Sequence, residues 1–153
     1  MKREVAIKIF FFLVFICTIM LWYKCSSEMG EKTNKLLDNN IYFTGTLIYM
    51  KASNNHIYGL IRVKIDSSNV KNYYKQSDDY IFPYRIENDT AEIYCYVPIL
   101  SGLTYDKTKV ILDSNKRNVY FYENNKEIAA ATLFINGSEI DKAFIKKNTI
   151  FKK

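Results

Sequence analysis

The amino-acid sequence predicts a mainly β protein, with an N-terminal transmembrane helix followed by an antiparallel β sandwich or small barrel and a short C-terminal helix. Three observations support this fold class. An apolar run fills residues 5–24, apolar and polar residues alternate in several later segments, and Asn-rich pairs separate those segments. The 153 residues suffice for one domain and an anchor.

The apolar run follows a basic flank, residues 1–4, that we expect in the cytoplasm. The uncharged stretch from Ile9 to Tyr23 would form a helix of only about 22 Å, but the length from Val5 is about 28 Å, close to a hydrocarbon core, provided that Lys8 extends to the interface. Trp22 and Tyr23 suit the far interface, and Lys and Arg are more frequent before the run than directly after it. The run therefore predicts a single-pass cell-membrane protein with an extracytoplasmic C-terminal domain, and the lipid bilayer is the partner of residues 5–24.

Two processing alternatives remain open for this segment. The small residues Cys25, Ser26 and Ser27 could form a signal-peptidase site, which would give a secreted protein. Acylation of Cys25 would instead give a lipoprotein, although Trp22-Tyr23-Lys24 is bulkier than the residues that usually precede a lipidated cysteine. A retained anchor is the favoured interpretation.

A polar stalk is expected over residues 25–40, and a β domain over residues 41–151. Odd-numbered residues are apolar in both 41–49 and 57–65, and a three-residue loop, 53–55, would place these two faces on one side of a hairpin. Gly45 and Gly59 lie inside the strands, where glycine indicates a bulge or a close approach of backbones.

Three further hairpins follow from loops at 88–89, 114–117 and 124–125. Residues 126–135 are predicted to be a strand, with a helix as the alternative because of the alanines at 129–131. Residues 138–147 show helical spacing after a capping serine, which predicts the short C-terminal helix. The loop lengths set three cross-strand pairs: Leu112 with Val119, Phe121 with Ile128, and Val119 with Ala130.

The composition predicts no cofactor, no metal site and no set of catalytic residues. The chain has one His, three Cys and five Gly, too few for a multi-His metal centre or a Gly-rich phosphate loop. Cys95 is expected to be a small buried apolar residue. An enzyme would have to use His56, the only imidazole, as its general base, and this remains an alternative.

Tyrosines form the candidate ligand-binding face. Tyr94 and Tyr96 alternate with apolar residues on one strand, and Tyr120 and Tyr122 do so on another, so an open sheet face could offer their rings for stacking. Three basic residues could add charge, Arg62, Lys64 and Arg85. The alternative is that both sheet faces are packed and that Tyr is present because it favours strands.

The formal net charge of +6 does not point to nucleic acid, and none is expected as a partner. Four of the 22 basic residues and one of the 16 acidic residues lie in the first 25 positions, so the exported part is only mildly basic. An envelope protein or a glycan is the expected partner, and the sequence leaves the oligomeric state open.

The basic start, the single apolar segment, the Asn-rich stalk and the stretch FTGTLIYMKASNNHIYGLIRVKI resemble small membrane-anchored exported β-domain proteins of AT-rich bacteria. The resemblance implies an anchored β domain and no catalytic residues. The function expected is a non-catalytic binding or structural module. One alternative is an OB-like barrel that binds oligosaccharide or single strands, and the other is the enzyme that uses His56.

Overall fold

A computed structural model describes residues 2–97 and 103–151 of the chain, which divides into two compact units, Met1–Leu36 and Leu37–Lys153. Helix α1, Lys2–Leu37, makes up the first unit, except that its last residue, Leu37, is counted with the second unit. The helix continues through most of the segment expected to be a polar stalk. Among the residues that the structure describes, no helix has both the length and the mean hydropathy that a membrane span requires.

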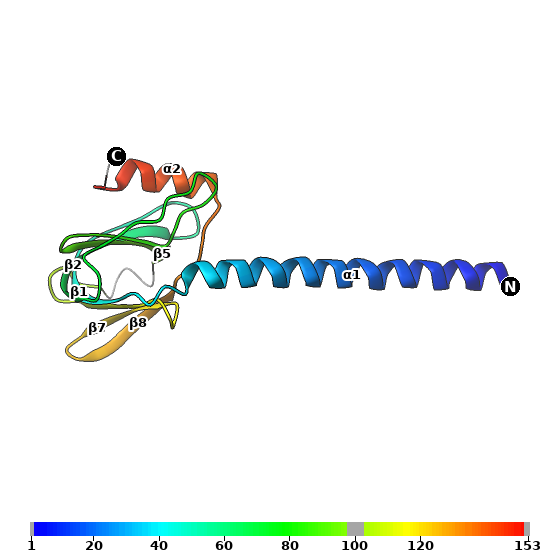
Figure 1. The fold of residues 1–153 in the computed structure, drawn as a ribbon, viewed down its shortest axis with the longest axis horizontal. Coiled ribbons are helices and arrows are strands. Elements are labelled where there is room, and N and C mark those ends of the chain that lie inside the picture. Colours follow the sequence, from blue (N-terminus) through cyan, green and yellow to red (C-terminus); the bar gives the residue numbers. More distant parts are fainter. Residues whose placement is uncertain (1, 98–102, 152–153) are drawn as a thin grey trace. The chain divides into compact units, whose positions relative to one another are not determined.

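The second unit is built on one antiparallel sheet, which confirms the predicted mainly β class (Figure 1). The strand order is β3-β4-β5-β2-β1-β6-β7-β8. The strands are β1 Tyr42–Ala52, β2 Tyr58–Ser68, β3 Asn72–Tyr73, β4 Tyr84–Glu87, β5 Thr90–Tyr96, β6 Lys109–Asp113, β7 Asn118–Glu123 and β8 Lys126–Thr132.

The sheet curls, and its two ends are bridged. Ile81, which precedes β4, and Asn136, which follows β8, exchange backbone hydrogen bonds of 2.7 and 3.2 Å. Helix α2, Glu139–Asn148, follows this bridge and lies over the layer that contains β2 and β5 (Figure 1). Ser138 caps the helix by accepting a hydrogen bond from the Asp141 backbone, as the sequence predicted.

The main core fills the concave side of the sheet, where the alternating residues meet. Phe43, Leu47, Ile61 and Val63 are all fully buried there, so the two odd-numbered faces do share one side. The thiol of Cys95 lies in the same core, and burial raises its pKa to about 12.

Most of the predicted hairpin registers are confirmed. The two-residue loop at 88–89 pairs Glu87 with Thr90, and the four-residue loop at 114–117 pairs Leu112 with Val119. Residues 126–132 form a strand and not a helix, as predicted. The predicted partners of Phe121 and Val119 in this strand were each wrong by one residue. A register shift after Phe121 sets that residue opposite Ala129 and sets Val119 opposite Ala131.

The first hairpin loop is also longer than predicted. The connection between Ala52 and Tyr58 spans residues 53–57. Its left-handed residues are His56, at a φ of 50°, and Ile57, at a φ of 62°, and not an asparagine. The two odd-numbered faces still share one side, because register shifts at Leu47/Tyr49 and Thr44/Gly45 set Leu47 opposite Val63 and Gly45 opposite Ile65 between them.

We expect the folded domain to lose stability above about pH 9. Burial raises the pKa of the Tyr58, Tyr84 and Tyr94 hydroxyls above the ordinary 10.0, and the Cys95 thiol behaves likewise. The unfolded chain therefore releases these protons at lower pH than the folded chain does. Their contribution to stability is complete below about pH 9 and is lost as the pH rises past the ordinary values.

Thermal unfolding of the full chain in nanodiscs, followed by near-ultraviolet circular dichroism between pH 7 and pH 11, measures this loss. Tyr58→Phe is the matched variant, because the buried Tyr58 hydroxyl has no hydrogen-bond partner among the described residues, so the change removes the titrating group and breaks no contact. This variant should unfold with a shallower alkaline slope. An unfolding temperature that stays constant across the range would contradict the prediction.

Candidate functional site

A second, smaller core lies between the sheet and α2. Tyr58 and Leu60 from β2, Tyr94 from β5 and Ile81 pack against Ile145 of the helix. This packing uses the face of β2 and β5 opposite the main core, so both faces of these strands are covered. The second core forms the base of the cleft that we identify as the candidate site.

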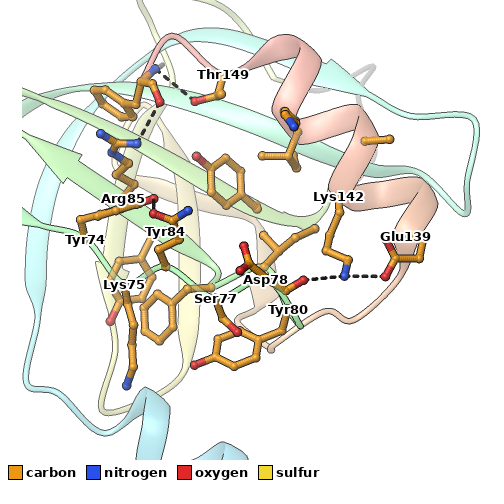
Figure 2. A pocket seen from close by; sticks show the side chains of 18 residues that line it. Tyr74, Lys75, Ser77, Asp78, Tyr80, Tyr84, Arg85, Glu139, Lys142 and Thr149 are labelled. Atoms are coloured by element: carbon orange, nitrogen blue, oxygen red, sulfur yellow. Dashed lines mark hydrogen bonds and ion pairs between the residues drawn. The ribbon is translucent and has the colours of Figure 1, made fainter. Parts of the chain in front are cut away.

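The cleft encloses about 460 Å³ between α2 and the segment that precedes β4. Figure 2 shows Tyr74, Lys75, Ser77 and Tyr80 on one side, while Lys142 projects from α2 on the other. Its volume falls within the roughly 300–1,000 Å³ typical of small-molecule sites. The cleft combines flat rings with cations and is not simply apolar.

Arg85 is held between two aromatic rings at one end of the cleft. Its guanidinium carbon lies 4.2 Å from the centre of the Tyr74 ring and 4.7 Å from that of Phe151. The same guanidinium donates a 2.9 Å hydrogen bond to the Phe151 carbonyl and pairs with Glu87 at 3.3 Å. Arg85 thereby ties the C-terminal residues to β4 and sets the position of the exposed Tyr74 ring.

Lys142 closes the other end. Its ammonium donates to the Asp78 carbonyl at 2.9 Å and pairs with the Glu139 carboxylate at 2.5 Å (Figure 2). These contacts hold the 77–80 segment against α2. Lys146 lies one turn further along the helix and is exposed, with no hydrogen bond or ion pair among the described residues.

A buried carboxylate fixes the chain beyond α2. Glu92 of β5 is fully buried and accepts hydrogen bonds from Arg62 at 2.8 Å, the Tyr94 hydroxyl at 2.9 Å, the Thr149 hydroxyl at 2.5 Å and the Ile150 backbone at 3.1 Å. Burying a carboxylate is favourable only when it is paired and hydrogen-bonded in this way. Glu92 consequently holds Thr149, a residue of the cleft wall, in place.

A second cavity, of about 580 Å³, lies beside β1 and β6. Its charged residues, Asp66 and Lys109, already neutralise each other at 2.8 Å, and Tyr122 is its one aromatic residue. It therefore offers a ligand fewer groups than the cleft does. Among the described residues, no three His, Cys, Asp or Glu side chains come together as metal ligands.

Comparison with known protein families, curated proteins and solved structures finds no match to this chain.

The structure does not assemble the tyrosine face expected from the sequence. Tyr94 is 6% exposed because α2 covers its side of the sheet, and this corrects the prediction of an open ring. Tyr96 is 49% exposed, but its ring stacks on Phe134 with 5.0 Å between centres. Tyr120 and Tyr122 of β7 do not line the cleft that Tyr94 lines, and Tyr122 lines the second cavity instead.

Of the three basic residues predicted beside the tyrosines, Arg85 lines the same cleft as Tyr94, and the other two lie elsewhere. Arg62 is held by Glu92 and lies over the Tyr49 ring at 4.6 Å, whereas Lys64 is exposed further along β2. His56 is exposed in the first hairpin loop. The side chain of Cys25, the lipidation candidate, lies outside the described residues.

Sequence reasoning missed the cleft and Glu92. The segment 74–80, YKQSDDY, has no helical or strand period, and its mixture of Tyr, Lys and Asp is the only sequence feature that could have drawn attention to it. Glu92 occupies a position that looks like the solvent side of an alternating strand. Its burial depends on α2, which lies about 50 residues later in the chain.

Proposed function

We propose that the protein is a membrane-anchored extracytoplasmic binding module whose ligand occupies the cleft between α2 and residues 74–80. The observation that carries this proposal is the combination, in one cleft of about 460 Å³, of exposed rings and cations on fixed elements. Lys142 and Glu92 hold the walls together, so the groups that face a ligand are already positioned before it binds.

The N-terminal segment supports the anchoring part of the proposal. The large apolar side chains of α1 are exposed, with Phe10 at 63% and Trp22 at 76%. An exposed apolar surface of this length is stabilised by a hydrocarbon environment, and the basic residues before it favour a cytoplasmic N-terminus. The same segment supports the likeness to anchored exported bacterial proteins.

The binding part is tested by filling the cleft. Ala143 is an exposed residue of α2 that lines the cleft, whereas the exposed Ile140 of the same helix does not. The full chain in nanodiscs is presented to an array of bacterial envelope saccharides and of acidic and basic peptides. Ala143→Trp should abolish binding of the ligands retained by the wild type, and Ile140→Trp should leave it unchanged.

Two results would overturn the cleft as the ligand site. The wild type could retain no probe on the array, or both tryptophan variants could bind as the wild type does. The anchoring part is tested separately by the intact mass of the membrane-extracted protein. A full-length mass supports a retained anchor, while loss of the N-terminal segment or an added acyl mass at Cys25 would replace it with secretion or lipidation.

A further inference from the structure

We infer that the ligand of the cleft is an acidic saccharide, a sugar unit that carries a carboxylate or a phosphate. This inference rests on the proposed function and names the ligand class of the same site. It follows from the charge of the lining residues, the shape of the aromatic groups among them and the kind of backbone that the cleft presents.

The charge of the lining favours an anion. Four cationic side chains and two acidic ones line the cleft: Lys75, Arg85, Lys142 and Lys146 against Asp78 and Glu139. Lys142 is paired with Glu139, and Arg85 is paired with Glu87 outside the lining. The groups left are Lys75 and Lys146 against Asp78, a net of one positive charge. Because Lys146 is exposed and unpaired among the described residues, its ammonium can contact an anion without breaking an existing ion pair.

The rings favour a sugar as the carrier of that charge. Tyr74 and Tyr80 both line the cleft (Figure 2). Tyr74 is 46% exposed although Arg85 lies over its ring, and Tyr80 is partly exposed, so part of each ring is accessible to a ligand. A sugar ring has one apolar face that can stack on an aromatic ring, and its hydroxyls can form hydrogen bonds with the polar side chains of the lining. A bare inorganic anion would leave the rings unused.

The backbone of the cleft does not favour a peptide. Peptides bound by strand addition pair with the exposed backbone of a sheet edge. Here the two walls are a helix and the segment 74–80, and they present side chains. An acidic peptide is therefore the competing ligand that the experiment must exclude.

Binding is measured with the full chain in nanodiscs and five defined probes: trigalacturonate, glucose 6-phosphate, maltotriose, inorganic phosphate and an Asp- and Glu-rich hexapeptide. We expect trigalacturonate or glucose 6-phosphate to bind at least about tenfold more tightly than the other three, with an affinity that falls as salt is added. The tighter of the two identifies the acidic group. Lys146→Gln should weaken this binding about three- to fivefold, the effect typical of one exposed charge.

Lys147→Gln is the matched control, since Lys147 is the next residue of α2, is also exposed and does not line the cleft. Equal binding of maltotriose, tighter binding of the hexapeptide or of inorganic phosphate, or equal effects of the two lysine variants would overturn the acidic saccharide. If Ala143→Trp still blocks the probe that binds, those results leave the proposal that the cleft is the ligand site standing. Binding that Ala143→Trp does not affect would overturn both proposals.

Discussion

Glu92→Ala is expected to lower the free energy of unfolding by about 3–5 kcal/mol, the usual cost of removing one partner from a buried ion pair. The Arg62 side chain is only 15% exposed and would lose its counter-charge. Tyr94, Thr149 and the Ile150 backbone would lose their acceptor as well. Thermal and denaturant unfolding of the full chain in nanodiscs would measure the change, with the unfolding temperature lower by roughly 10–20 °C.

Two variants make this result specific. Glu87→Ala removes the partner of Arg85 from a half-exposed pair, so it should cost less than about 1 kcal/mol. Arg62→Met combined with Glu92→Met removes both charges and should recover part of the loss, because no charge is then left buried alone. If Glu92→Ala unfolds at the wild-type temperature, the buried network does not hold the C-terminal residues in place.

Gly45→Val is expected to cost at least about 3 kcal/mol, or to prevent folding, because β1 and β2 leave no room for a side chain at this position. A Cβ at residue 45 would collide with the Lys64 carbonyl and with the Val63 side chain. The carbonyl is part of the paired backbone at the register shift in β1, so it cannot move aside without breaking the ladder. The yield of folded protein and its unfolding free energy provide the measurement.

Gly137→Ala is the matched control for this substitution. A Cβ there would lie 3.7 Å from the Asp79 carbonyl, an ordinary van der Waals contact, and the backbone φ of residue 137 is not positive. We expect a change below about 1 kcal/mol, since alanine also reduces the entropy of the unfolded chain. A Gly45→Val protein as stable as this control would show that the strands can separate locally at no cost.

The sheet was predictable from the sequence because its hairpins are governed by short-range rules. Alternation placed Phe43, Leu47, Ile61 and Val63 on one side. The loop lengths at 88–89 and 114–117 set the registers of the β4–β5 and β6–β7 pairs. The register shift after Phe121 was not predictable, since it adds a residue without a glycine or proline to mark it. The resulting strand exposes Ile128 at 41% and turns Ala129 and Ala131 toward Phe121 and Val119.

The site was not predictable because it depends on which sheet face a distant helix covers. The tyrosines of β5 alternate as an open face would, yet α2 packs on that face and buries Tyr94. Glu92 likewise occupies a strand position that predicts a surface residue. Its burial depends on contacts with Arg62 and Thr149, which are 30 and 57 residues away in the sequence. Local periodicity describes a strand but does not identify its tertiary neighbours.

The contacts of Glu92 have a consequence for how the protein is made. Thr149 and Ile150 are synthesised 57 and 58 residues after this carboxylate, so the strand hairpins can form on a growing chain while Glu92 still lacks two of its partners. Until α2 docks, the face of β2 and β5 that carries Leu60 and Tyr94 is uncovered and exposes apolar surface. We therefore expect a chain truncated before Thr149 to be digested by protease faster than the full chain, because Glu92 then lacks the Thr149 hydroxyl and the Ile150 backbone.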